Sequence, residues 1–132
     1  MNRVVVDASA LVALAFNEPK GAEVARRLEG AAVFAPALLK SEMANAAWKK
    51  ARRQPDCAQP ILAALATALD PRWGITWMEV DHAGAVLVSL ATGLSTYDAS
   101  YLWLAGILGA DLVTLDGDLA GATEDDGRPG DR

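Results

Sequence analysis

Hydrophobic residues along this chain form short apolar runs that alternate with longer segments of helical periodicity. The clearest short run is Arg3 to Val6, whose three valines are typical of a buried β-strand. Further strands are expected at residues 31–35, 77–80 and 112–115. Helices are expected at residues 8–16, 23–28, 37–53, 61–69, 82–92 and 96–108. This alternation predicts an α/β fold, with a central parallel sheet and helices on both of its faces.

Proline and glycine positions set the expected boundaries. Pro36 is expected in the first turn of the helix that follows it. Residues 121–132 contain Gly, Asp, Pro and Arg with almost nothing apolar. We therefore expect one folded domain over residues 1–120 and a disordered polar tail over residues 121–132.

Composition and charge leave the class of binding partner open. The chain has 132 residues, of which 52% are hydrophobic and 22% charged, so one domain with a substantial core is expected. Its net charge of −5 is uneven, because residues 1–110 carry ten acids and ten bases. Residues 111–132 carry seven acids and two bases. Since the whole excess lies at the end of the chain, it does not exclude a nucleic-acid partner.

Two further features bear on the compartment. No apolar segment approaches the ~18 residues that a membrane-spanning helix needs. The single cysteine, Cys57, has no partner for an internal disulfide, which fits a reducing compartment. We expect a cytoplasmic protein without a membrane partner.

Four carboxylates occupy comparable places relative to the expected elements. Asp7 and Asp116 directly follow strands, Asp98 lies in the first turn of a helix, and Glu42 lies on the helix after the second strand. Each has an ordinary explanation as a helix cap, a turn residue or a surface residue. In a parallel sheet, however, the carboxyl ends of the strands and the starts of the following helices share one edge. We therefore expect the four acids to converge on one cleft.

Converging carboxylates repel one another, which raises the pKa of at least one of them. A hard divalent cation such as Mg²⁺ or Mn²⁺ relieves that repulsion, because it prefers oxygen ligands. Such an ion lowers the pKa of a bound water and stabilises charge on phosphate oxygens, which suits phosphoryl chemistry. Ser9, two residues after Asp7, is placed to hydrogen-bond a ligand carboxylate or a metal-bound water.

Four segments of the chain resemble a known family. Residues 5–11 (VVDASAL), 41–46 (SEMANA), 96–102 (TYDASYL) and 114–119 (TLDGDL) resemble the motifs of PIN domains, in the same order. The resemblance covers about residues 1–120 and is greatest to the VapC-type ribonuclease toxins of bacterial toxin–antitoxin pairs. It implies a three-layer α/β/α fold with a parallel sheet of four or five strands. The fifth strand of the family would fall in the polar tail.

The resemblance also implies a function and a set of site residues. The implied activity is hydrolysis of RNA by an Mg²⁺- or Mn²⁺-dependent endoribonuclease, on a substrate of the tRNA or rRNA class. The implied partners are a small antitoxin protein, which inhibits the enzyme, and a second copy of the chain in a homodimer. The implied catalytic residues are Asp7, Glu42, Asp98 and Asp116, with Asp7, Asp98 and Asp116 as metal ligands. The supporting residues are Ser9, Asn45 and Thr114. To these we add Asp118, an acid beyond the family pattern, and the sequence leaves open whether Asp116 or Asp118 lies nearer the metal.

The helix expected at residues 37–53 ends in a basic cluster that consists of Lys49, Lys50, Arg52 and Arg53. Lys49 and Arg52 share a helical face with Glu42. The cluster is therefore a candidate contact for the RNA backbone that leads to the acids. The alternative is a solvated helix end, because cations are favourable near a helix C-terminus.

Two other interpretations remain open. A phosphotransferase of the haloacid dehalogenase type also begins with a strand and an aspartate. Such enzymes use Asp-x-Asp, whereas this chain has Asp7-Ala8-Ser9. A non-catalytic α/β binding module would use the acids as caps and turns, and the basic helix and the four tryptophans for contact.

Overall fold

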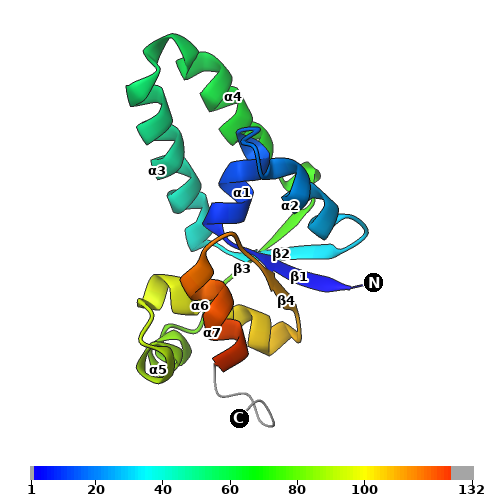
Figure 1. Cartoon of the computed structure of the whole chain (residues 1–132), viewed down its shortest axis with the longest axis vertical. Helices are drawn as coiled ribbons and strands as arrows, with labels where there is room; N and C mark the ends of the chain where they lie inside the picture. The colour runs from blue at the N-terminus through cyan, green and yellow to red at the C-terminus, as the bar shows by residue number, and fades with distance from the viewer. Residues whose placement is uncertain (1, 126–132) are drawn as a thin grey trace.

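A four-stranded parallel sheet lies at the centre of the computed structural model, which describes residues 2–125 (Figure 1). The strands are β1 (Arg3–Val6), β2 (Ala32–Pro36), β3 (Ile75–Met78) and β4 (Asp111–Val113). Their order is β3-β2-β1-β4, so the first strand lies inside the sheet between β2 and β4. Val5 pairs with Phe34 on one side and with Leu112 on the other.

Helices cover both faces of this sheet (Figure 1). One layer contains α1 (Ala8–Ala15), α2 (Gly21–Leu28), α3 (Leu38–Arg53) and α4 (Ala58–Leu69). The other contains α5 (His82–Thr92), α6 (Thr96–Leu108) and α7 (Gly117–Asp125). Short 3₁₀ turns, η1 (Pro55–Cys57) and η2 (Pro71–Trp73), precede α4 and β3. The predicted three-layer α/β/α architecture is confirmed.

The core is built from the residues that the apolar pattern singled out. Val4, Val5 and Val6 are at most 2% exposed, and α1 packs Leu11 against them with no exposed surface. On α3, Leu39 and Met43 are fully buried, which leaves the opposite face of that helix for polar residues. None of the described helices is long and apolar enough to cross a membrane.

Several expected boundaries were wrong. Pro36 is the last residue of β2 rather than the first turn of a helix. The third strand is Ile75–Met78 instead of 77–80, and the fourth is Asp111–Val113 instead of 112–115. Residues 121–125, expected in a disordered tail, form the second half of α7. The remainder of that expected tail, residues 126–132, lies outside the described residues, as does any fifth strand there.

Candidate active site

Asp7 lies at the junction of β1 and α1 and is buried, with 4% of its surface exposed. Its backbone N–H donates to the carbonyl of Val113 in β4 at 3.2 Å. Its Oδ1 atom accepts from the backbone N–H of Ala10 at 3.0 Å and so caps α1. The ordinary explanation of Asp7 as a helix cap is therefore correct, but the capping bond uses only Oδ1 of the two carboxylate oxygens.

Two hydroxyl groups hold the same carboxylate. Thr114 Oγ1, directly after β4, donates to Asp7 Oδ2 at 2.5 Å, and Ser9 Oγ donates to Asp7 Oδ1 at 2.8 Å. Ser9 Oγ in turn accepts from the backbone N–H of Leu115 at 2.9 Å. Thr114 Oγ1 accepts from the backbone N–H of Asp116 at 3.0 Å. These bonds fasten the end of β1 to the end of β4, although Asp7 and Thr114 are 107 positions apart.

Asp116 lies directly before the first residue of α7. Its Oδ1 atom accepts from the backbone N–H of Asp118 at 2.9 Å and from that of Leu119 at 3.3 Å. Asp116 is half-buried, whereas Asp118 is exposed. The alternative explanation of Asp116 as a turn residue is therefore correct in part, because its carboxylate caps the start of α7.

Asp98 enters the site from the first turn of α6. Ser95 caps this helix, because its Oγ atom accepts from the backbone N–H of Asp98 at 3.2 Å. The carboxylate of Asp98 takes no part in that bond. The predicted cap is thus made by the side chain of Ser95, and the half-buried acid of Asp98 remains available to the site.

Glu42 reaches the site from α3 and is held by a residue that sequence analysis missed. The hydroxyl of Tyr101, on α6, donates to Glu42 Oε1 at 2.5 Å. Tyr101 is 1% exposed, and a buried tyrosine hydroxyl requires a partner. Its position three residues after Asp98, on the same face of the helix, was the available signal.

The pKa values of three of these acids are raised, and burial is the largest cause for each. Burial raises the pKa of Asp7, and the charge of Asp116 adds to this effect. The hydrogen bonds that Asp7 accepts lower its pKa, but by less than burial raises it. The pKa of Glu42 is raised by burial and, despite its hydrogen bond, by the charges of Asp98 and Asp7. The pKa of Asp98 is raised by burial and by the charges of Asp116, Asp7 and Asp118. The structure thus brings all four predicted catalytic acids into electrostatic range of one another.

A cleft of about 830 Å³ opens beside these acids. Ser9 and Glu42 line it, together with Asn45 and Lys49 from the next two turns of α3. The expectation that Glu42, Asn45 and Lys49 share one helical face is therefore confirmed. Glu42 is the one of the four site acids that lines this cleft, and Ser9 and Tyr97, which also line it, are near neighbours of Asp7 and Asp98 in the chain.

The four cations of the basic cluster at the end of α3 differ in their surroundings. Lys49 lines the cleft. Lys50 is half-buried, pairs with Glu18 and lies 5.4 Å from the centroid of the Phe16 ring. The other two cations are exposed, and the Arg52 guanidinium lies 4.5 Å from the centroid of the Trp48 ring.

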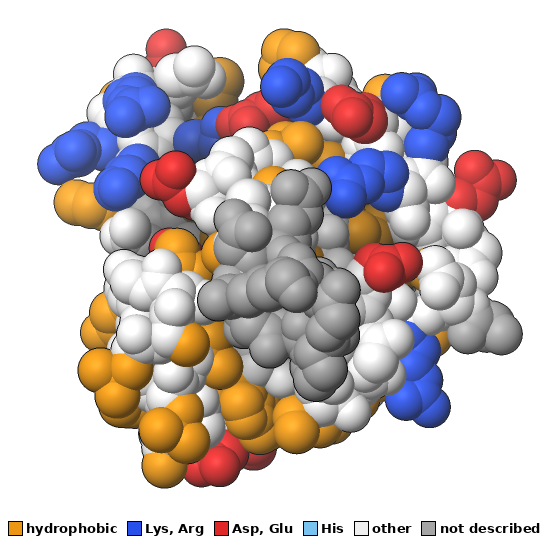
Figure 2. Space-filling model, turned by 60° about the horizontal axis from the view of Figure 1, so that its bottom comes forward, with side chains coloured by type: hydrophobic (Ala, Val, Ile, Leu, Met, Phe, Trp, Pro, Cys, Tyr) orange, Lys and Arg blue, Asp and Glu red, His pale blue; other side chains and the backbone are white. Residues whose placement is uncertain are grey.

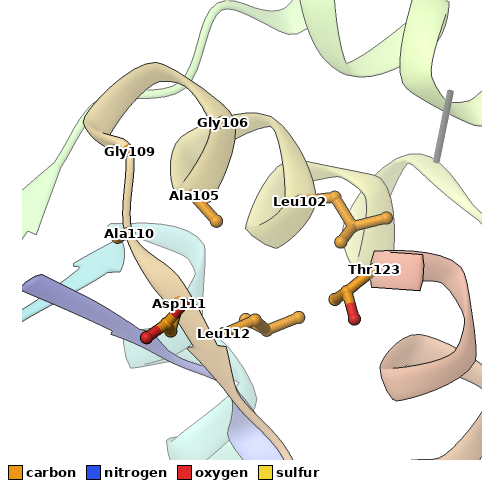
Figure 3. A pocket seen from close by; sticks show the side chains of 8 residues that line it. All are labelled: Leu102, Ala105, Gly106, Gly109, Ala110, Asp111, Leu112 and Thr123. Atoms are coloured by element: carbon orange, nitrogen blue, oxygen red, sulfur yellow. The ribbon is translucent and has the colours of Figure 1, made fainter. Parts of the chain in front are cut away.

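A second hollow, of about 380 Å³, lies at the opposite end of β4 (Figure 3). It is formed where α6 ends at Gly109, where β4 begins at Asp111, and beside Thr123 of α7. Asp111 is the single acid among the described residues that line it. Its lining contains none of the four site acids, whereas the cleft described above is lined by Glu42, so that cleft is the better candidate for chemistry.

The donors of the acidic centre fit a hard divalent cation, because all of them are oxygens. The ion pairs among residues 2–125 are Lys50–Glu18 and Arg72–Asp70, so none of the site acids is neutralised in this part of the chain. Within the same residues, no three acidic, histidine or cysteine side chains are grouped tightly enough to hold a metal ion as they stand. Binding of a metal ion by three of these acids would therefore require their side chains to draw closer together.

Comparisons with known proteins agree with this geometry. The family model of the PIN domain matches residues 4–124. Ribonuclease VapC3 of Pyrobaculum aerophilum is 34% identical over 122 residues, which are 89% of this chain and 92% of that protein. Ribonuclease VapC12 of Mycobacterium tuberculosis is 36% identical over 120 residues, which are 89% of each chain.

Solved structures show the same fold. The crystal structure of PAE2754 from Pyrobaculum aerophilum matches with a TM-score of 0.70 and 31% identity, over 91% of this chain and 85% of that one. Mycobacterium tuberculosis VapC20, described as a sarcin–ricin loop cleaving toxin, matches with a TM-score of 0.65, over 90% of this chain and 94% of that one. Its identity is 17%, so this second likeness concerns the fold alone.

Proposed function

This chain belongs to the PIN domain family, as a VapC-type member, and from that premise we propose that it is an Mg²⁺- or Mn²⁺-dependent endoribonuclease toxin. The observation that carries the proposal is the group of mutually interacting carboxylates at the carboxyl edge of the sheet, beside an open cleft. Two curated relatives with ribonuclease names, each covering 89% of this chain, support the reaction class.

We assign the metal to Asp7, Asp98 and Asp116. A bound divalent cation would lower the pKa of a water molecule and stabilise charge on the phosphate oxygens. Asp116 interacts with both Asp7 and Asp98, whereas Asp118 interacts with Asp98, so Asp116 is the better candidate ligand of the two. Ser9 and Thr114 fix the orientation of Asp7 through their hydroxyl groups. Such outer bonds typically hold a ligand in its productive orientation.

The other site residues bind substrate or move protons. Tyr101 engages Glu42 Oε1, which leaves Oε2 to accept a proton from the attacking water. Asn45 and Lys49, exposed along the cleft, are placed to contact the RNA backbone. Arg52 and Arg53, which are exposed, extend that contact, whereas Lys50 is already paired with Glu18.

Three further properties are proposed from the family resemblance. The substrate belongs to the tRNA or rRNA class, the enzyme acts in the cytoplasm, and a small antitoxin protein inhibits it. The antitoxin is expected to be encoded by a short open reading frame just upstream, and its co-expression should relieve the growth arrest caused by this chain alone.

Neither alternative interpretation gains support. A dehalogenase-type enzyme would need a second acid at position 9, where Ser9 instead donates to Asp7. The match to the PIN domain family over residues 4–124 also assigns the chain to a family other than the haloacid dehalogenases. If the purified protein does not cleave RNA, that result would favour the non-catalytic binding module.

Metal removal tests the proposal directly. RNA cleavage by the purified protein is expected to fall to background in EDTA and to return with Mg²⁺ or Mn²⁺. Asp98→Asn should abolish cleavage, because a neutral amide is a poorer ligand for a hard cation. Asp56→Asn is the matched control, since Asp56 is an exposed acid of η1 outside the cleft lining. Full cleavage by metal-free protein, or equal loss in both variants, would contradict the proposal.

A further inference from the structure

The cleft beside the acids contains an aromatic side chain that the chemistry above does not use. Tyr97 lines this cleft and is 67% exposed. It precedes Asp98 in the first turn of α6, so its backbone is held by the same helix start that presents a site carboxylate. Isolated exposed apolar residues are common on protein surfaces. The position of Tyr97 inside the cleft, next to the acidic centre, therefore carries more weight than its exposure.

The walls of the cleft are of two chemical kinds. Apolar side chains, including Val12, Leu38 and Leu115, line it together with the ring of Tyr97. Polar groups, including Glu42, Asn45 and Lys49, line it as well. A nucleotide has matching parts, because its base is flat and largely apolar on both faces while its phosphate is anionic. The volume of about 830 Å³ lies within the usual range of small-molecule pockets, about 300–1,000 Å³.

We propose that Tyr97 is a stacking platform for one unpaired base of the RNA, next to the phosphate that the acidic centre attacks. This inference rests on the proposed function and refines its substrate to single-stranded RNA or a loop. In a duplex, each base is already stacked on both faces and paired at its edge, so its face is not available to a side chain. Aromatic stacking accepts any base, so Tyr97 selects unpaired structure rather than sequence.

The position of Tyr97 also explains how a cleft next to acidic side chains could bind an anionic polymer such as RNA. The acids repel phosphates, and Lys49 is the cation that lines the cleft among the described residues. Stacking supplies affinity that does not depend on charge. The base is then held while its phosphate is kept near the carboxylates.

The test uses a short single-stranded RNA of mixed sequence with 2-aminopurine in place of one adenine. The fluorescence of this base falls when it stacks on an aromatic ring. The protein carries Asp116→Asn, so that the RNA stays intact in Mg²⁺. Binding and quenching are compared for Tyr97, Tyr97→Phe, Tyr97→Leu and Tyr97→Ala, with Leu62→Ala as the control. Leu62 is 51% exposed on α4, outside the cleft lining.

Tyr97→Phe is expected to bind and quench like the parent, because stacking needs the ring and not the hydroxyl. Tyr97→Leu and Tyr97→Ala should bind about 5- to 150-fold more weakly, the equivalent of one lost base–aromatic stack, and should lose the quenching. Leu62→Ala should change neither. A fully paired duplex should bind the parent more weakly than the single strand and show no quenching that depends on Tyr97.

Four results would overturn the inference. They are unchanged quenching in Tyr97→Ala, equal behaviour of Tyr97→Leu and Tyr97→Phe, absence of RNA binding, or a changed oligomeric state in Tyr97→Ala. The last would assign Tyr97 to a protein interface. Cleavage by the wild-type protein in Mg²⁺ is measured separately. Quenching that depends on Tyr97, without any cleavage, would refute the proposed nuclease activity and support the stacking role. Cleavage that is unchanged when Tyr97 is replaced would support the nuclease activity and refute the stacking role.

Discussion

Asp7→Asn replaces one oxygen of a buried carboxylate with an amide group and can keep the atom that caps α1. Asparagine caps helices about as well as aspartate, so α1 should persist. The neutral amide is a poorer metal ligand. We therefore expect cleavage in Mg²⁺ to fall by at least the roughly 10- to 100-fold that follows loss of an outer hydrogen bond at such sites. Cleavage at the wild-type rate would remove Asp7 from the site.

The same substitution has an expected pH signature in metal-free protein. Burial and then the charge of Asp116 raise the pKa of Asp7 above its ordinary value of 3.8, so ionising Asp7 costs folding stability. The free energy of unfolding is therefore unreduced below the pKa that Asp7 has in the unfolded state, and it falls as the pH rises through the pKa that Asp7 has in the folded state. In EDTA, Asp7→Asn should melt at the same or a higher temperature than wild type near pH 7, and the difference should shrink in acid. Thermal melts over this pH range measure it, and they also reveal a variant that is inactive because it is unfolded.

Sequence reasoning located the acids because their positions follow from strand ends and helix starts. Asp7 and Asp98 could be placed in this way without any contact being known. Tyr101 could not, because its partner Glu42 is 59 positions away and on another helix. The different surroundings of the basic residues were equally hidden from the sequence, since Lys50 is paired with Glu18, which lies in the loop between α1 and α2.

At the scale of elements, the close packing of α1 against α2 depends on one glycine. A Cβ atom at Gly21, the first residue of α2, would lie 2.5 Å from the carbonyl oxygen of Ala13. Because that oxygen belongs to the backbone, Gly21→Ala must shift a helix, with a cost of about 1–3 kcal/mol. Gly106→Ala is the matched control, because among the described residues nothing beyond the adjoining backbone of α6 lies within 4 Å of its Cβ position. It should stabilise by up to about 1 kcal/mol.

Thermal unfolding of these two variants provides the measurement. Gly21→Ala should lower the melting temperature by several degrees, whereas Gly106→Ala should leave it unchanged or raise it. Equal effects of the two substitutions would mean that helix propensity, and not the approach of α1 to α2, decides the stability at Gly21.

The wrong element boundaries have local physical causes. α7 contains Gly117 and Gly121, which have low helix propensity, but the Asp116 cap and the buried Leu119 stabilise it. Pro36 is tolerated at the end of β2 because the pairing with β1 stops at Phe34. Ala37 donates to the carbonyl of Met78, so the backbone nitrogen of Pro36 faces the side where no partner strand continues.

At the scale of the whole molecule, charged and apolar side chains are concentrated in different parts of one face. In the view of Figure 2, Lys and Arg side chains gather in the upper part, and hydrophobic side chains gather at the lower left. Large apolar residues are exposed on α5 and α6, with exposed fractions of 46% for Val86, 68% for Leu87, 78% for Leu90 and 64% for Ile107. We predict that this apolar face binds a second copy of the chain, because large exposed apolar patches mark interaction surfaces.

Sedimentation or light scattering tests the homodimer. The double variant Leu87→Glu with Leu90→Glu should be monomeric at concentrations where wild type is a dimer, because burying the introduced charges is costly. Leu62→Glu, on α4, is the control for an exposed leucine outside this face and should leave the dimer intact. A wild-type protein that is monomeric at all concentrations would refute the prediction.

The pairing of β4 with β1 also determines at what point of synthesis the acidic centre can be complete. A ribosome builds the chain from the N-terminus, so Asp7 and Glu42 emerge long before Thr114 and Asp116. Until β4 docks, Asp7 lacks the hydroxyl of Thr114 and the whole cluster lacks the carboxylate of Asp116. A contact over 107 positions also forms late, because closing so long a loop is slow. A nascent or prematurely terminated chain that lacks β4 therefore has no complete centre, and for a ribonuclease of the proposed kind this order of assembly withholds activity until the segment with Thr114 and Asp116 has been made and has docked.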